Sequence, residues 1–224
     1  GVENGASGNC PTQSLVDQYE YQNNGETFGH RNPGSIDLNA DPYAGLDPRF
    51  ELTIVKNGDT WPTNGAQKRV IETYEGGFNG APKYGATPTG YYLRKFVDGS
   101  SVTTADNQTS KRHTWIVIRL AEMYLDFAEA AFYATGSANE PLFGMTANDA
   151  VNVLRTRKDI DMPKFKEDQE AWVERYERER LVEFAFEDQR FWDVRRWKKG
   201  EQYFKNVTAA SISSDLKLTR EVHT

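Results

Sequence analysis

The sequence predicts a mainly α-helical domain that carries long irregular loops and a few short strands. Two observations lead to this prediction. Apolar residues concentrate after Thr114, where they recur at the three- and four-residue spacing of helices. The chain before Thr114 is instead rich in Gly, Pro, Asn, Asp and Tyr, and several of these favour turns and loops. We therefore expect one domain, with a loop-rich part (1–113), a helical scaffold (114–200) and a C-terminal tail (201–224).

The composition argues against several functional classes. The 224 residues carry a net charge of -6, whereas binding to nucleic acid requires a basic face. No run of about 18 apolar residues is present, so we expect no membrane-spanning helix. The single cysteine, Cys10, cannot form an internal disulfide, and the residues before it do not resemble a signal peptide. We therefore expect Cys10 not to be lipidated, and Gly1 suggests a cut end with sequence missing upstream.

Short elements are expected in the loop-rich part. Residues 11–20 predict a helix with Thr12 as its N-cap. The alternation in Arg49–Val55 predicts a strand, which Asn57-Gly58 would connect to a short return at Asp59–Trp61. Gly90–Phe96 is a second strand candidate. The remaining stretches have no period, so we expect loops at 21–47, 62–88 and 97–112.

The loop-rich part as a whole carries too many aromatic side chains to be disordered, because disordered segments lack aromatics. We expect its loops to be ordered and to pack on the helical scaffold. The aromatic residues concerned are Tyr43, Phe50, Trp61, Tyr74, Phe78, Tyr84, Tyr91 and Tyr92.

The helical scaffold is expected to begin with a helix pair. Thr114–Ile118 is extended or starts a helix, and Arg119–Thr135 forms a helix that ends at Gly136. Its only polar stripe consists of Arg119, Glu122, Asp126 and Glu129, so we expect it to be buried along every other face. Thr146 to Asp149 resembles a capping box and starts a second helix, whose apolar face consists of Ala147, Ala150, Val151 and Leu154.

The stretch Trp172–Gly200 is expected to form the central helix of the domain. It begins near Asp168, breaks near Glu187–Gln189 and ends at Gly200. Its middle, Leu181–Phe186, is almost wholly apolar and must be covered by other elements.

Several strings in the chain resemble the SusD/RagB family of glycan-binding outer-membrane lipoproteins. They occur in the expected order and read PTQSLVDQYE (11–20), DPYAGLDPRF (41–50), IRLAEMYLDFAEA (118–130) and ERLVEFAFEDQRFWDVRRW (179–197). The chain departs from the family at Asp188-Gln189, where a Gly-His pair is common. It is also about half the family's length, and the signal peptide, lipidated cysteine and several helix pairs of the N-terminal half have no counterpart here.

The resemblance implies a fold and a function. The fold would be SusD-like, with tetratricopeptide-like helix pairs and long loops that carry the ligand site on one face. The protein would capture an oligosaccharide at the outer face of the outer membrane and deliver it to a SusC-like, TonB-dependent transporter. Attachment to the membrane would be only through a lipidated N-terminus that this chain does not contain. Some relatives are associated with peptides, so a peptide-binding protein or an interaction scaffold is the alternative.

Sugars are bound by flat aromatic rings with planar polar groups beside them, so loop segments that combine the two are candidates for the ligand site. Trp61 is the best candidate, with Asn57, Asp59 and Asn64 beside it. It could equally be a residue that packs the loop onto the scaffold. Weaker candidates are Tyr74, Tyr84, Tyr91 and Tyr92.

The aromatic and arginine-rich stretch Arg190–Trp197 is interpreted as structural. We expect its arginines to pair with Glu122, Asp126 and Glu129 in a partly buried network, so that Arg195→Ala lowers the melting temperature more than it weakens ligand binding.

We expect no catalytic residue, no metal and no cofactor. The three histidines are far apart and show no ligand spacing, and Asp41, Asp47 and Asp59 match no calcium-binding loop. A glycoside hydrolase needs two carboxylates at a fixed separation. Acidic residues in the loops could supply them, but no motif surrounds Asp41, Asp47, Glu51, Glu72 or Glu75.

Overall fold

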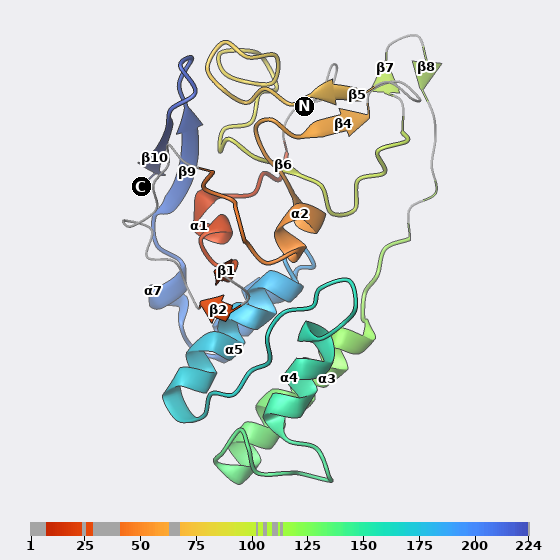
Figure 1. Ribbon diagram of the computed structural model, residues 1–224, viewed down its shortest axis with the longest axis vertical. Helices are drawn as coiled ribbons and strands as arrows, with labels where there is room; N and C mark the ends of the chain where they lie inside the picture. The colour runs from red at the N-terminus through yellow and green to blue at the C-terminus, as the bar shows by residue number, and fades with distance from the viewer. Residues whose placement is uncertain are drawn as a thin grey trace.

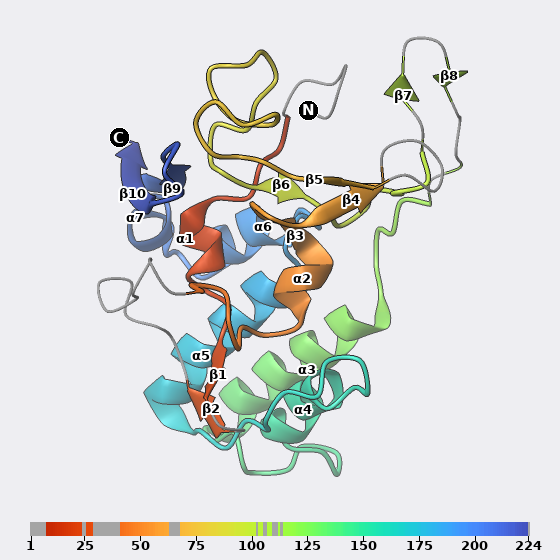
Figure 2. The ribbon, with the colours of Figure 1, turned by 45° about the horizontal axis from the view of Figure 1, so that its top comes forward.

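The computed structural model describes residues 8–23, 26–28, 41–62, 68–101, 103–104, 107–108, 112 and 114–223. The protein is mainly helical, as predicted. The longest helices gather at one end of the molecule, and loops with most of the short two-stranded sheets form the other end (Figures 1 and 2). No helix in the described part is both long and apolar enough to cross a membrane.

Three helices form the helical end: α3 (Leu120–Thr135), α4 (Ala147–Arg155) and α5 (Gln169–Glu183). Alanines let α3 and α4 approach closely, and α3 and α5 together form a column of stacked rings. Phe132 stacks on Trp172 with ring centroids 4.4 Å apart, and Trp172 stacks on Tyr176 at 4.6 Å. The buried alanines and aliphatic residues around this column are Ala121, Leu125, Ala128, Ala131, Ala147, Ala150, Val151 and Leu154.

Local capping signals determine where these helices begin and end, and the sequence predicted the caps at Gly136 and Thr146 and a helix start near Asp168. Gly136 ends α3 with a φ of 77°, a left-handed conformation that favours glycine. Thr146 and Asp149 form the capping box of α4. Asp168 caps α5, and its carboxylate also accepts hydrogen bonds from the Ser137 hydroxyl and the Ala138 amide, at 2.6 Å each.

One expectation about α3 is wrong. Its core face is buried, but Leu120 is 68% exposed and Met123 49% exposed, so the helix is not covered on all its apolar sides. The preceding segment 114–119 is extended rather than helical.

The central stretch breaks where predicted but ends differently. Residues 184–188 separate α5 from α6 (Gln189–Arg196), and Phe186 and Asp188 adopt positive φ there. Within this middle, Val182, Phe184 and Ala185 are buried. The predicted end at Gly200 is wrong, because Gly200 begins the short helix α7 (Gly200–Tyr203). The tail then forms a hairpin of β9 (Val207–Ile212) and β10 (Leu218–His223).

The first helix, α1 (Gln13–Val16), starts as predicted, with the Thr12 side chain accepting a hydrogen bond from the Leu15 amide. The predicted strand Arg49–Val55 is wrong for most of its length, because α2 (Arg49–Thr53) precedes a two-residue strand, β3 (Ile54–Val55). Asp47 starts this helical turn by accepting a hydrogen bond from the Arg49 amide. The turn lets Phe50 enter the core while the Arg49 guanidinium reaches α5.

The predicted hairpin is also wrong. β3 pairs with the distant β6 (Tyr92–Leu93), and β4 (Thr60–Pro62) pairs with β5 (Lys68–Val70). Two further short hairpins in the described residues are β1 (Tyr21–Asn23) with β2 (Glu26–Phe28), and β7 (Thr103–Thr104) with β8 (Asn107–Gln108). A second core lies under these loops and is made of Val16, Tyr19, Phe50, Ile54, Tyr91, Val182, Ala210, Ile212 and Leu218.

A buried ion-pair network joins the loop-rich part to the helices. The Arg49 guanidinium donates to Asp47 at 2.6 Å, to Glu179 at 2.6 Å and to Glu183 at 2.9 Å. Arg155, which is fully buried, bridges Glu179 and Glu20 at 2.6 Å each. The sequence did not reveal this network, because its partners are up to 135 positions apart.

A second network confirms part of the expectation for Arg190–Trp197. Arg196 makes a two-point contact with Glu129, with both distances 2.6 Å, and Trp197 donates to the same carboxylate. Asp126 is bound instead by Arg180 of α5, at 2.6 Å. The expectation that Arg195 pairs with these acidic residues is wrong, because this side chain is exposed and lies over the Phe191 ring.

Candidate ligand-binding surface

Asn57 and Asp59 belong to a turn whose side chains are already engaged. The Asn57 side-chain oxygen accepts a hydrogen bond from the Thr73 amide at 2.9 Å. The Asp59 carboxylate accepts from the Lys56 amide at 2.9 Å and pairs with the Lys56 ammonium group at 2.5 Å. The turn is therefore held firmly against the segment that follows β5.

Trp61 is half-buried in β4 and lies opposite Arg69 of β5. Side chains of directly opposed residues in an antiparallel pair share one face, so these two project together. Gly99 packs beneath Trp61 and Pro62, where a Cβ on Gly99 would lie 3.2 Å from the Pro62 ring. Asn64 lies outside the described residues.

Two of the predicted tyrosines hold the loops in place. Tyr91 is buried, and its hydroxyl donates to Gln13 at 2.6 Å and contacts the Tyr43 hydroxyl at 3.0 Å. Burial raises the pKa of Tyr91 well above its ordinary value, and a ligand cannot reach this ring. Tyr92 donates from its hydroxyl to the Asn79 carbonyl oxygen at 2.9 Å and accepts from the Thr87 amide at 3.1 Å.

The loop at 72–81 is closely packed, and Tyr74 is part of it. Tyr74 is half-buried against the core under the loops. A Cβ on Gly80 would lie 1.9 Å from the Tyr74 carbonyl oxygen, and one on Gly77 would lie 2.6 Å from that of Glu72. Only glycine permits so close an approach, so this loop has a well-defined shape.

Tyr84 and Phe78 project from this ordered region. Tyr84 is 96% exposed in a turn that is closed by a hydrogen bond from the Ala86 amide to the Lys83 carbonyl. Phe78, which is not among the predicted site residues, contacts both the Arg69 guanidinium (3.8 Å from the ring centroid) and the Lys83 ammonium group (4.7 Å). Its position between glycines, in the string GGFNG, was the signal that could have revealed it.

Arg69 connects these side chains into one surface. It faces Trp61 across the β4–β5 hairpin and lies over Phe78, which in turn contacts Lys83 beside Tyr84. We call Trp61, Arg69, Phe78, Lys83 and Tyr84 the loop surface. It offers aromatic rings with cationic hydrogen-bond donors between them.

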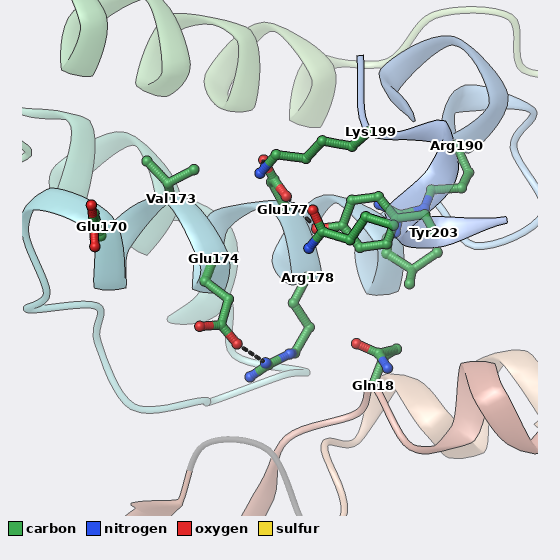
Figure 3. A pocket seen from close by; sticks show the side chains of 11 residues that line it. Gln18, Glu170, Val173, Glu174, Glu177, Arg178, Arg190, Lys199 and Tyr203 are labelled. Carbon is green, nitrogen blue, oxygen red and sulfur yellow. Dashed lines mark hydrogen bonds and ion pairs between the residues drawn. The ribbon is translucent and has the colours of Figure 1, made fainter. Parts of the chain in front are cut away.

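Two hollows formed by described residues lie away from the loop surface. One, of about 440 Å³, runs along α5 and is lined largely by polar side chains (Figure 3). In it, Arg178 pairs with Glu174 at 3.2 Å and Lys199 pairs with Glu177 at 2.6 Å. None of the predicted site residues lines this hollow.

A second hollow, of about 410 Å³, lies between α2, the end of α5 and the segment before α3. Lys95 lines it and donates to the carbonyl oxygens of Glu183 and Ala185 as well as to the Glu187 carboxylate. Burial lowers the pKa of Lys95 despite these acceptors. None of the predicted site residues lines this hollow either. Across the described residues, no group of three acidic, histidine or cysteine side chains could hold a metal ion.

Comparisons with known proteins agree with one another. The model of the SusD family matches residues 1–211. A crystal structure of a SusD-like protein from Bacteroides fragilis superposes with a TM-score of 0.78 at 28% identity, and the match covers 96% of this chain and 41% of that one. A SusD-like carbohydrate-binding protein from the same species gives a TM-score of 0.66 at 24% identity, covering 90% of this chain and 37% of that one.

The chain thus spans about two fifths of the length of these solved structures. No curated protein sequence gives a significant match.

Proposed function

This chain belongs to the SusD family, and from that premise we propose that it binds an oligosaccharide outside the cell and delivers it to a SusC-like, TonB-dependent transporter. The protein would act at the outer face of the outer membrane, attached through a lipidated N-terminus. Family membership supports binding rather than catalysis, and a relative of the same fold is described as carbohydrate-binding.

The observation that carries the proposal is the loop surface. The C–H groups on one face of a sugar ring pack against an aromatic ring, while its hydroxyls need polar partners at the rim. Tyr84 presents a free ring, Trp61 a half-buried one, and Arg69 and Lys83 supply donors between them. The surface is held in shape before binding by the close contacts of Gly77 and Gly80.

Most of the other predicted site residues would support the loop surface without contacting the ligand themselves. Asn57 and Asp59 keep the turn beside Trp61 in position, and Tyr74 and Tyr92 support the loop. Asn64 stays a proposed contact because of its place three residues after Trp61 in the sequence. Tyr91 is no longer proposed as a ligand contact, because its side chain is buried.

Calorimetric titration with panels of oligosaccharides and of peptides tests the proposal. We expect heat of binding with at least one glycan class and none with peptides. Heat with peptides and none with any glycan would replace the sugar proposal by the peptide alternative.

The same mixtures test whether the protein is an enzyme. We propose that it is not, and expect the oligosaccharides to be recovered unchanged by chromatography after prolonged incubation. A hydrolysis product that a heat-inactivated sample does not form would contradict this.

A further inference from the structure

The hollow along α5 collects charged side chains from three parts of the fold (Figure 3). We call it the α5 hollow. Arg190 of α6 and Tyr203 of α7 line it on one side, and Gln18 approaches it from the end of α1. Its volume of about 440 Å³ is within the range of sites for small molecules. The remaining wall is one face of α5, because its members recur at spacings of three and four: Glu170, Val173, Glu174, Glu177, Arg178 and Leu181.

The buried carboxylate in the α5 hollow is fully engaged by the protein itself. Glu177 is 3% exposed and pairs with the Lys199 ammonium group at 2.6 Å. The Tyr203 hydroxyl donates a hydrogen bond to the other oxygen of the same carboxylate. Because Glu177 and Lys199 neutralise each other, neither charge is available to a ligand.

Arg190 is a cation whose charge is not matched in the same way. Its guanidinium lies over the Tyr203 ring, 4.1 Å from the centroid, and 5.9 Å from the centroid of the Trp197 ring. The acidic residues whose charge acts on it, Asp193 and Glu177, are ion-paired with other cations. Within the described part of the chain, its Nη1 atom is buried and has no hydrogen-bond partner. Arg190 can therefore still bind an anion.

Arg178 is the second cation of this kind. Only 11% of its side chain is exposed, and its Nε atom is buried without a hydrogen-bond partner among the described residues. Its ion pair with Glu174 is 3.2 Å long, and Glu174 is 75% exposed, so the pair is a weak one. Burial lowers the pKa of both Arg178 and Arg190, because their present contacts do not offset the loss of hydration. An anion in the hollow would supply the missing contacts.

The other lining residues indicate which anion fits. Guanidinium groups bind carboxylates and phosphates through paired hydrogen bonds. Glu170 and Glu174 are exposed in the same hollow and would repel a phosphate dianion more strongly than a singly charged carboxylate. Val173 and Leu181, both half-buried, offer apolar contact to the body of an organic molecule.

We infer that the α5 hollow binds a small organic carboxylate, with the guanidinium groups of Arg190 and Arg178 as its hydrogen-bond donors. A sugar acid and the C-terminus of a short peptide both present this group. The α5 hollow lies apart from the loop surface, so the inference does not rest on the proposed function.

Calorimetric titration of the 224-residue chain with matched pairs of probes tests the inference. Glucuronate is compared with glucose, and acetyl-dialanine with its amide, so that the members of each pair differ chiefly in the carboxylate. Inorganic phosphate is titrated as the competing anion. We expect at least one acid to bind, and to bind at least about tenfold more tightly than its neutral counterpart and than phosphate. The acid that binds identifies the source of the carboxylate.

Variants locate the binding in the α5 hollow. Arg190→Gln should raise the Kd for that acid at least about tenfold. Arg195→Gln is the matched control, because Arg195 is also an arginine of α6 that lies over an aromatic ring, but does not line the hollow. Arg178→Gln should weaken binding as well and provides a second test if circular dichroism shows that Arg190→Gln does not fold.

Glu174→Gln should act in the opposite direction. It removes a like charge from the hollow and releases Arg178 from its ion pair, so the Kd should fall about two- to fivefold. Because Glu174 is largely exposed, this change should leave the melting temperature unaltered. A merely structural role for the two arginines would not produce tighter binding.

Several results would overturn the inference. One is the absence of heat from either acid at concentrations up to about 10 mM. Another is binding of a neutral counterpart as tight as that of its acid, or tighter binding of phosphate than of both acids. The last is a Kd that neither Arg190→Gln nor Arg178→Gln changes, which would place the carboxylate elsewhere on the protein.

Discussion

Arg49 contacts three carboxylates inside the protein and so joins helix α2 to helix α5. Its guanidinium binds Asp47 from its own turn and Glu179 and Glu183 from α5. Removing one partner of a buried ion pair leaves the other charges without compensation, which costs more than the pair itself contributes.

We therefore expect Arg49→Gln to lower the free energy of unfolding by about 3–5 kcal/mol. Urea denaturation followed by circular dichroism measures this. Lys217→Gln, which removes an exposed pair with Asp215, is the matched control and should leave the midpoint unchanged. A loss for Arg49→Gln no larger than the control's would show that the network is not essential to the fold.

The acidic partners make stability depend on pH. Burial disfavours the charged form of Glu183, but the ion pairs with Arg49, Arg157 and Arg119 outweigh it and lower the pKa to about 2. The folded pKa lies below the ordinary 4.5, so the contribution is complete above about pH 4.5 and is lost as the pH falls toward 2. The pKa values of Glu20 and Glu179 are shifted in the same direction by their arginine partners.

We expect the free energy of unfolding to fall steeply between pH 4.5 and about pH 2, with Glu183 alone accounting for about 3 kcal/mol. Urea titrations at pH 7, 4 and 2.5 measure the slope. Glu183→Gln should be less stable at pH 7 and less sensitive to acid. An unchanged acid slope in that variant would contradict the assignment.

The arginine that stabilises the α3–α6 contact is Arg196, not Arg195 as the sequence suggested. Both lie in the run VRRW, and only the helical phase of α6 decides which one faces Glu129. Arg196→Ala should lower the melting temperature by more than Arg195→Ala does. Thermal melts of the two variants side by side measure this, and equal melting temperatures would argue against the pairing with Glu129.

At the scale of elements, the loop at 72–81 gives the sharpest test of packing. Gly80→Ala would place a methyl group against the Tyr74 carbonyl oxygen, and overpacking of this kind costs about 1–3 kcal/mol. Gly200→Ala is the control, because a Cβ there meets only ordinary contacts at 3.8 Å. Chemical denaturation compares the two, and wild-type stability in Gly80→Ala would show that the loop is looser than described.

The elements that the sequence predicted correctly are those set by nearby residues. The caps Thr12, Gly136 and Thr146 each act within a few positions and were identified, and the start of a helix near Asp168 was also predicted. The pairing of β3 with β6 joins segments nearly 40 positions apart, so no local sequence pattern could predict it. Arg49–Thr53 alternates like a strand, yet contacts with Asp47 and α5 hold it as a helical turn.

At the scale of the whole molecule, the division of the chain into a loop-rich part and a helical part was predictable. The ligand-binding residues were predictable only in part. Composition showed where the loops and helices lie, and the family strings identified the relatives. Which loop aromatics are available to a ligand depends on burial alone. Tyr91 and Tyr84 are seven positions apart in similar sequence, and one is in the core while the other is fully open.

The central claim is that the loop surface binds a sugar through its exposed rings. Phe143 provides a matched control, because it is 95% exposed and lies at the helical end of the molecule. Calorimetric titration of an oligosaccharide that binds the wild type should be repeated with Tyr84→Ala and Phe143→Ala. The account predicts that Tyr84→Ala raises the Kd about tenfold, the loss expected for one stacked ring, while Phe143→Ala leaves it unchanged. An unchanged Kd in Tyr84→Ala, or an equal loss in both variants, would contradict the account.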